Sequence, residues 1–218
     1  MKNLFNFLLL ATTILTMSSC FEITEEVTVN KDGSGNYIST IDATKLSEQM
    51  QMLAAFDTTG EMVPKLKYSL DSTFSETFKK YRQIKGVTNV KVDTSKSYIY
   101  KVTMDYKDVN VLNEVVNLDK KGADRQELYA WQKGQLSRKD FALNLDDMKM
   151  EDESQKEMAK SMLEGMKYTI IFNLPGKVKK SINKEAKISD DKKTVILACS
   201  LLDVMDKKVS LGNEVNYK

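Results

Sequence analysis

Short runs in which apolar and polar residues alternate recur along this chain, and they constrain its fold more than any other feature. Turn residues bound these runs, which cover residues 22–44, 87–107, 128–143 and 167–178. Successive side chains of a β-strand point to opposite faces of a sheet, so alternation over several residues predicts a strand with one buried face. We therefore expect the chain to be built around a β-sheet.

The turn residues between the runs predict how neighbouring strands are joined. Asp32-Gly33 stands between two alternating runs and is a strong hairpin signal. Lys133-Gly134 has the same role in the run 128–143, and residues 94–96 join the two strands of the run 87–107. The sheet is accordingly expected to be mostly antiparallel.

Helical periodicity is found between these strands. Residues 45–56 carry apolar side chains on one helical face, and a further helix is expected to begin near Asp71–Thr73, where Thr73 and Glu76 have capping-box spacing. The preceding residues, 57–70, are expected to be irregular because they contain Gly60 and Pro64. The aromatic face of the further helix is formed by Phe74, Phe78 and Tyr81.

Residues 109–118 are ambiguous between a short helix and a strand, because their spacing suits the helix and their β-branched content suits the strand. The acidic segment 146–157 lacks the glycine and ligand spacing of an EF-hand. Its carboxylates are better explained by the helix expected at 155–166, whose positive end they would face.

That helix would align Met158, Met162 and Met166 on one face. Thioethers are flexible fillers of a core, they recur on adaptable apolar binding surfaces, and clusters of them bind Cu(I). All three interpretations stay open from the sequence, with core packing as the first.

The last third contains a strand within 167–178, ended by Leu174-Pro175-Gly176, and a final strand within 194–205. Both faces of the final strand are apolar or small, which predicts a central strand covered on both sides. Cys199 would then be a buried structural thiol.

Length and composition complete the fold prediction. The chain has 218 residues, of which 41% are hydrophobic and 29% are charged, and only 2 prolines and 9 glycines interrupt it. We expect one continuous α+β domain over residues 20–218: a mostly antiparallel, twisted sheet with two to four helices packed on one face.

Charge and residue types exclude several functions. The net charge is +2 and arginine is rare, which argues against a nucleic-acid partner. The chain has no histidine, so Ser-His-Asp and Cys-His catalysis and His-ligated zinc or haem are excluded. No GxSxG motif or metal-ligand spacing is present, and serines stand near lysines only because lysine is abundant. We expect a protein that is not an enzyme and needs no cofactor.

The N-terminus has the layout of a secretory signal peptide. Lys2 is followed by an apolar stretch, residues 4–15, that is too short for a confident membrane span, and then by small residues before Cys20. The alternative is a buried amphipathic helix, which the polar, strand-like pattern directly after Cys20 disfavours. Residues 1–19 are therefore predicted to be a signal peptide.

Met17-Ser18-Ser19-Cys20 resembles the lipobox of bacterial lipoproteins, in a relaxed form found in Bacteroidetes. The resemblance implies cleavage before Cys20 by signal peptidase II and attachment of acyl chains to Cys20, including a palmitate-type N-acyl group. Two or three buried chains anchor a protein stably.

A second resemblance rests on the two ends of the mature chain. Residues 27–35 form a strand with an Asp-Gly turn, and the last third combines a strand, Leu174-Pro175-Gly176-Lys177-Val178, a polar segment and a further strand that starts at Asp191-Lys192-Lys193-Thr194-Val195. This arrangement resembles the LppM-type lipoprotein domain. The resemblance implies an α+β envelope domain that binds lipid or glycolipid without known catalysis.

The sequence thus predicts a non-enzymatic protein anchored in the cell envelope through acyl chains on Cys20. Phe21 occupies the position of an inner-membrane retention aspartate, which favours the outer membrane, facing the periplasm. A lipid or other amphipathic ligand is the first expected partner, and the alternative is a structural or assembly subunit of an envelope complex. The expected ligand-binding residues are Phe74, Phe78, Tyr81, Met158, Met162 and Met166.

Overall fold

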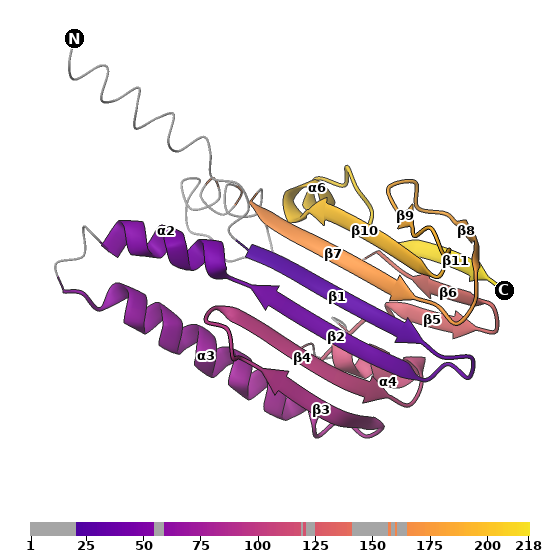
Figure 1. Ribbon diagram of the computed structural model, residues 1–218, viewed down its shortest axis with the longest axis horizontal. Coiled ribbons are helices and arrows are strands. Elements are labelled where there is room, and N and C mark those ends of the chain that lie inside the picture. Colours follow the sequence, from indigo (N-terminus) through magenta and orange to yellow (C-terminus); the bar gives the residue numbers. More distant parts are fainter. Residues whose placement is uncertain are drawn as a thin grey trace, which may run out of the picture.

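Two sheets make up the β-structure of the residues that the structure describes. The larger has 7 strands in the order β3-β4-β2-β1-β7-β10-β9, and the smaller has 4 strands in the order β5-β6-β11-β8. Figure 1 shows the computed structural model. It describes residues 21–54, 59–118, 120, 125–140, 157, 160 and 165–218.

The strands of the larger sheet are β1 (Phe21–Val29), β2 (Gly35–Asp42), β3 (Val87–Asp93), β4 (Ile99–Tyr106), β7 (Met166–Asn173), β9 (Lys187–Ile188) and β10 (Thr194–Ser200). The strands of the smaller sheet are β5 (Tyr129–Gln132), β6 (Gln135–Arg138), β8 (Val178–Ser181) and β11 (Asn213–Tyr217). The helices are α2 (Thr44–Ala54), α3 (Met62–Tyr81), α4 (Val109–Val116) and α6 (Leu201–Met205). Within the described part of the chain, no helix combines the length and apolar character needed to cross a membrane.

The expected hairpins are present. β1 and β2 pair antiparallel from Glu22 opposite Asp42 to Val29 opposite Gly35. The pairs β3–β4 and β5–β6 are also antiparallel, as their turn residues predict. These predictions are confirmed because a short turn between two strands leaves them only the antiparallel arrangement.

The centre of the larger sheet differs from the prediction, because β1 pairs with β7 in parallel, from Phe21 opposite Met166 to Thr28 opposite Asn173. The α+β class is confirmed, but the larger sheet is mixed and a separate smaller sheet accompanies it. Alternation of residue types reports which face of a strand is buried and carries no information about a partner that is distant in sequence.

One face of the larger sheet forms the core. Its buried side chains include Val27, Tyr37, Met104, Ile170 and Leu197. In Figure 1, α4 and the strands β5 and β6 lie behind the larger sheet, and α4 contacts β4 and β5. The opposite face carries side chains that are half-buried or exposed within the described residues, many of them threonine and asparagine.

Helix α3 begins at Met62, nearly three turns before the expected start. Pro64 is its third residue, where a proline is tolerated because the first N–H groups of a helix have no intrahelical acceptor. Thr73 and Glu76 lie in the helix interior, so the predicted capping box is wrong.

The ambiguous segment forms a helix, α4, and two of its asparagines hold the strand that follows. The N-cap Asp108 accepts hydrogen bonds from the backbone N–H groups of Asn110 and Val111, which starts the helix. Asn113 Nδ2 donates to the Tyr129 carbonyl at 2.8 Å, and the Tyr129 N–H donates to Asn113 Oδ1 at 2.9 Å. The side-chain amide of Asn113 thus pairs with the backbone as a neighbouring strand would.

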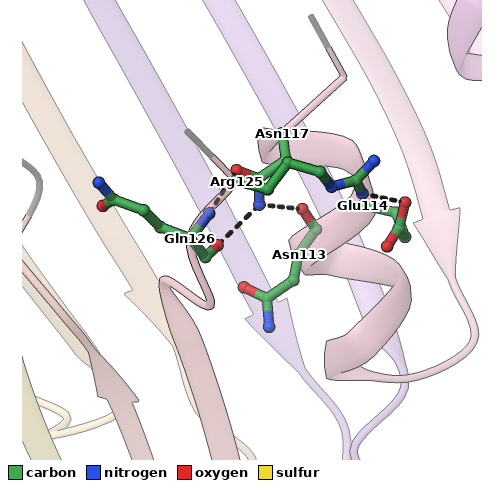
Figure 2. Close-up of polar contacts among 5 residues, drawn as sticks. All are labelled: Asn113, Glu114, Asn117, Arg125 and Gln126. Atoms are coloured by element: carbon green, nitrogen blue, oxygen red, sulfur yellow. Dashed lines mark hydrogen bonds and ion pairs between the residues drawn. The ribbon is translucent and has the colours of Figure 1, made fainter. Parts of the chain in front are cut away.

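Asn117 repeats this arrangement one helical turn later (Figure 2). Its Nδ2 group donates to the carbonyls of Asn113 and Gln126, both at 2.7 Å, and its Oδ1 atom accepts from the Gln126 N–H at 3.0 Å. An ion pair between Arg125 and Glu114 lies beside it. Together these contacts fasten the segment that enters β5 to helix α4.

The C-terminal strands correct two predictions. Ile196 is 37% exposed and Ala198 is exposed, so β10 is covered on one face only and is not a doubly covered strand. The strand ends at Ser200, which caps the short helix α6. Cys199 is half-buried, and its thiol donates to the Tyr168 carbonyl over 3.8 Å.

Candidate functional site

A groove of about 610 Å³ lies between helix α3 and strand β3, and we call it the α3–β3 groove. β3 is an edge strand of the larger sheet, with β4 as its one neighbour among the strands that the structure describes. The side chains that give the groove its character are Lys67, Tyr68, Phe78, Lys79, Arg82 and Val92.

The groove exposes large apolar side chains. Tyr68 on α3 is 76% exposed and Val92 on β3 is 38% exposed, whereas Phe78, between them and the core, is 5% exposed. Apolar side chains that gather at a depression with polar surroundings are characteristic of interaction sites. The groove therefore has Phe78 as an apolar floor, and the accessible side chains of Tyr68 and Val92 form its two walls.

Positive charge surrounds this apolar floor. Lys79 lies in the last turn of α3 and Arg82 is its C-cap residue. Cations at this end of a helix are favourable to the helix itself, which is a structural reason for their presence. Neither has an ion-pair partner among the residues that the structure describes, so both charges are available to a ligand.

Asp71, the carboxylate among the described residues that line the groove, is already neutralised. Asp71 accepts hydrogen bonds from Lys67 at 2.5 Å and from the Tyr100 hydroxyl at 2.7 Å. The hydrogen bond from Lys67, followed by that from Tyr100, holds the pKa of Asp71 below its ordinary value. Asp71 is thus ionised at neutral pH and paired with Lys67, which leaves the groove with excess positive charge.

The predicted aromatic face of α3 divides between core and groove. Phe74 stacks on Tyr100 with ring centroids 4.2 Å apart, and on Phe78 at 6.1 Å, so it belongs to the core. Tyr81 is half-buried and packs against the same core. Of the three predicted residues, only Phe78 lines the groove.

Met166, the described member of the predicted methionine face, does not line the groove. Met166 is the first residue of β7, opposite Phe21, and does not continue a helix. A strand is favoured there because Met166 leads directly into the alternating residues of β7, which pair on both sides. Met158, Met162 and the lipidation residue Cys20 lie outside the described residues.

Three residues of the groove are not predicted from the sequence: Lys67, Tyr68 and Val92. Tyr68 falls in the segment that was expected to be irregular, because Pro64 was interpreted as a helix breaker. A signal was present: Tyr68, Asp71, Ser75 and Arg82 follow at helical spacings and share one face of α3. Val92 could not be associated with this face from the sequence, since only the packing of α3 beside β3 brings them together.

A second polar cluster is buried between the two sheets. Tyr37 donates to Glu25 at 2.9 Å, Tyr129 donates to Glu25 at 3.4 Å, and Arg138 Nε donates to the Tyr129 hydroxyl at 3.3 Å. Burial, with the Glu25 charge as the next cause, raises the pKa of Tyr37, Tyr129 and Tyr168, so these hydroxyls stay protonated and can donate. A network of tyrosine hydroxyls between a carboxylate and a guanidinium suits a structural role, and here it joins β1, β2 and β7 to β5 and β6.

Comparisons with known proteins give one structural neighbour of note. No protein-family model and no curated protein matches the chain. Among solved structures, the chain is similar to the NMR structure of the folded domain of the Mycobacterium tuberculosis LppM protein. The two share 10% sequence identity at a TM-score of 0.43, over 92% of this chain and 91% of that chain.

Proposed function

We propose that this protein is a non-enzymatic, lipid-anchored component of the cell envelope that binds an anionic amphipathic ligand in the α3–β3 groove. The observation that carries the proposal is the combination of exposed apolar side chains, Tyr68 and Val92, with the cations Lys79 and Arg82, which form no ion pair within the described part of the chain. A membrane lipid or fatty acid with an anionic group presents the complementary pattern of an apolar chain beside a negative charge.

The energetics of such a complex follow from these side chains. Each methylene that leaves water on the apolar floor contributes about 0.8 kcal/mol. An anionic group near Lys79 and Arg82 adds roughly 1 kcal/mol for each cation. A ligand with a short stretch of chain in the groove would therefore bind measurably without being enclosed.

The proposed anchor would place the groove next to the membrane. The lipobox-like residues end at Cys20, and β1 starts at the next residue, Phe21. The sheet register puts the start of β1 beside Asp42 and Ile99, which is the end of the sheet where the β3–β4 turn and Thr94 of the groove lie. We propose the outer membrane, with the protein facing the periplasm.

Photo-crosslinking in intact cells tests the ligand. The full chain is expressed with a phosphatidylglycerol analogue that carries a photoreactive acyl chain, and labelled peptides are mapped by mass spectrometry. We expect labels on peptides that contain Tyr68, Phe78 or Val92. The double variant Lys79→Glu, Arg82→Glu should reduce labelling there by roughly tenfold, since both attractive charges become repulsive.

The matched control is Lys180→Glu, Lys187→Glu, which reverses two exposed lysines on β8 and β9, away from the groove. Labelling of α3 and β3 should be unchanged in this control. Equal labelling in both double variants, or labels confined to the residues around Cys20, would rule out the groove as a lipid site.

A second candidate function, assembly with an envelope protein, is favoured by the edge position of β3. Among the described residues, no strand pairs with the outer side of β3, and its side chains are mostly exposed. An extended segment of a partner could add to such an edge. Cross-linking in cells would then recover one stoichiometric protein partner attached to residues 87–93.

A further inference from the structure

A second cavity, which we call the distal pocket, lies at the other end of the molecule. Its volume is about 300 Å³. Three turns and the last strand converge on it, although they are distant in the sequence. The side chains that line it are Lys31, Trp131, Lys133, Pro175, Tyr217 and Lys218.

The topology separates the distal pocket from the start of β1. β1 and β7 run parallel, and Lys31 and Pro175 follow their last residues. A strand of 9 residues spans roughly 26 Å at about 3.3 Å per residue. In Figure 1 the tips of both arrows point toward the C-terminal end of the chain, opposite the N-terminal end of β1.

The indole of Trp131 is held in place from two directions. Its Nε1–H group donates to the Tyr217 hydroxyl at 2.8 Å. Gly33, with φ +87°, lies against the six-membered ring, and a Cβ atom at this position would be only 2.7 Å from it. Gly176 approaches the Lys218 carbonyl equally closely, with 2.5 Å between an added Cβ atom and that oxygen. Glycines thus allow the turns to close around a fixed aromatic ring.

The charged side chains that line the distal pocket, among the residues that the structure describes, have one sign. Lys31, Lys133 and Lys218 surround it, and its described lining residues include no Asp or Glu side chain. Within the part of the chain that the structure describes, none of the three lysines forms an ion pair. Such a rim attracts anions, whereas the rings of Trp131, Pro175 and Tyr217 supply apolar surface.

We propose that the distal pocket binds an anionic saccharide. One sugar ring would place its C–H face on the indole of Trp131, and its carboxylate would lie among the lysines. A volume of about 300 Å³ is at the lower end of the range for small-molecule sites, which suits a ligand of one or two rings better than an acyl chain. With the proposed anchor at Cys20, the pocket would face away from the membrane, toward the glycans of the envelope.

Fluorescence gives a direct test, because Trp131 is the single tryptophan of the chain. The full chain, purified in detergent, is titrated with glucuronate and with glucose at constant ionic strength. We expect a saturable change in emission with glucuronate and an at least tenfold weaker response to glucose. Sodium acetate supplies the carboxylate without the ring and should produce no saturable change.

Charge variants complete the test without touching the fluorophore. Lys31→Ala, Lys133→Ala should weaken glucuronate binding by tenfold or more, while Lys91→Ala, Lys101→Ala, on the exposed surface of β3 and β4, should leave it unchanged. Circular dichroism checks that each variant is folded. Absence of a saturable response, equal responses to glucose and glucuronate, or equal effects of both double variants would overturn the proposal.

The glucuronate titration tests the distal pocket independently of the α3–β3 groove. Lys79→Glu, Arg82→Glu should leave the glucuronate titration unchanged, because the two sites share no lining residue. A saturable change in Trp131 emission with dodecyl phosphate but not with glucuronate would overturn the proposed saccharide ligand. The ligand of the distal pocket would then be an amphiphile.

Discussion

Two side chains of this protein form paired hydrogen bonds with the backbone of the kind that a neighbouring strand usually forms. The amides of Asn113 and Asn117 each pair with a backbone segment through both their oxygen and their nitrogen. A helix has no free backbone groups along its side, so it cannot extend a sheet by itself. The asparagines supply the missing donors and acceptors and let α4 lie beside the start of β5.

Asn113→Ala should therefore destabilise the fold. The substitution leaves the buried N–H and carbonyl groups of Tyr129 without partners, and each unsatisfied group costs about 1–3 kcal/mol. We expect a loss of roughly 2–4 kcal/mol in the free energy of unfolding, measured by urea denaturation. Asn110→Ala, at an exposed position of the same helix, should change it by less than about 0.5 kcal/mol.

The rate at which the Cys199 thiol is alkylated should depend on pH in a way that reports its burial. Burial, followed by the charge of Asp203, raises the pKa of its thiol to about 11. The thiolate is the reactive form, so at pH 8 iodoacetamide should label Cys199 about 100-fold more slowly than an exposed thiol with the ordinary value of 9.0.

The sign of the pH dependence follows from the raised pKa. The folded state holds the proton more tightly than the unfolded chain, so this thiol favours folding fully below about pH 9 and loses that contribution as the pH rises toward 11. The labelling rate should rise steeply over this range. A rate at pH 8 equal to that of the urea-unfolded chain would contradict the assigned burial.

At the scale of elements, helix α3 decides whether the groove exists. It begins at Met62 because Pro64 is compatible with the first turn, and only this early start places Tyr68 on the helical face with Arg82. The start of the helix can be tested with two substitutions. One removes the proline of the first turn, and the other introduces a proline in the interior.

Pro64→Ala should change the free energy of unfolding by less than about 1 kcal/mol, since no hydrogen bond or fixed turn depends on the ring. Ser75→Pro, at an exposed interior position, should cost about 3 kcal/mol or more because it removes a helical hydrogen bond and its ring clashes with the preceding turn. Thermal unfolding followed by circular dichroism measures both. Comparable losses in the two variants would mean that α3 starts later than Met62.

At the scale of the whole molecule, the direction of β1 relates the two proposed sites to the proposed anchor. The α3–β3 groove reaches the end of the sheet where β1 starts, and the distal pocket lies where β1 ends. The protein would thus contact membrane lipid at one end and envelope glycan at the other. This arrangement requires that Cys20 carries the acyl chains.

Metabolic labelling tests the anchor. The wild-type chain should incorporate radioactive palmitate and fractionate with membranes, whereas Cys20→Ser should incorporate none. Cys199→Ser serves as the control and should be labelled as the wild type is, because its half-buried thiol lies within β10. Palmitate on the Cys20→Ser variant would exclude the proposed lipobox.

Much of the fold was predictable where the information is local. The Asp32-Gly33 and Lys133-Gly134 turns and the buried faces of β1, β4 and β7 follow from residues within a few positions of one another. Local patterns misled at Pro64, where the same residue suits a break or a first turn, and in β10, where apolar residues such as Ile196 stay exposed.

The sequence by itself determined the strands with their hairpin turns, the absence of histidine chemistry and the lipobox-like residues before Cys20, since each depends on composition or on short-range geometry. Only the tertiary structure decided the parallel β1–β7 pair, the packing of α3 beside β3 and the meeting of Trp131 with Tyr217, which are 86 residues apart. The physical reason is that side-chain periodicity specifies which face is buried, whereas the choice of partner depends on how distant segments fit together in three dimensions.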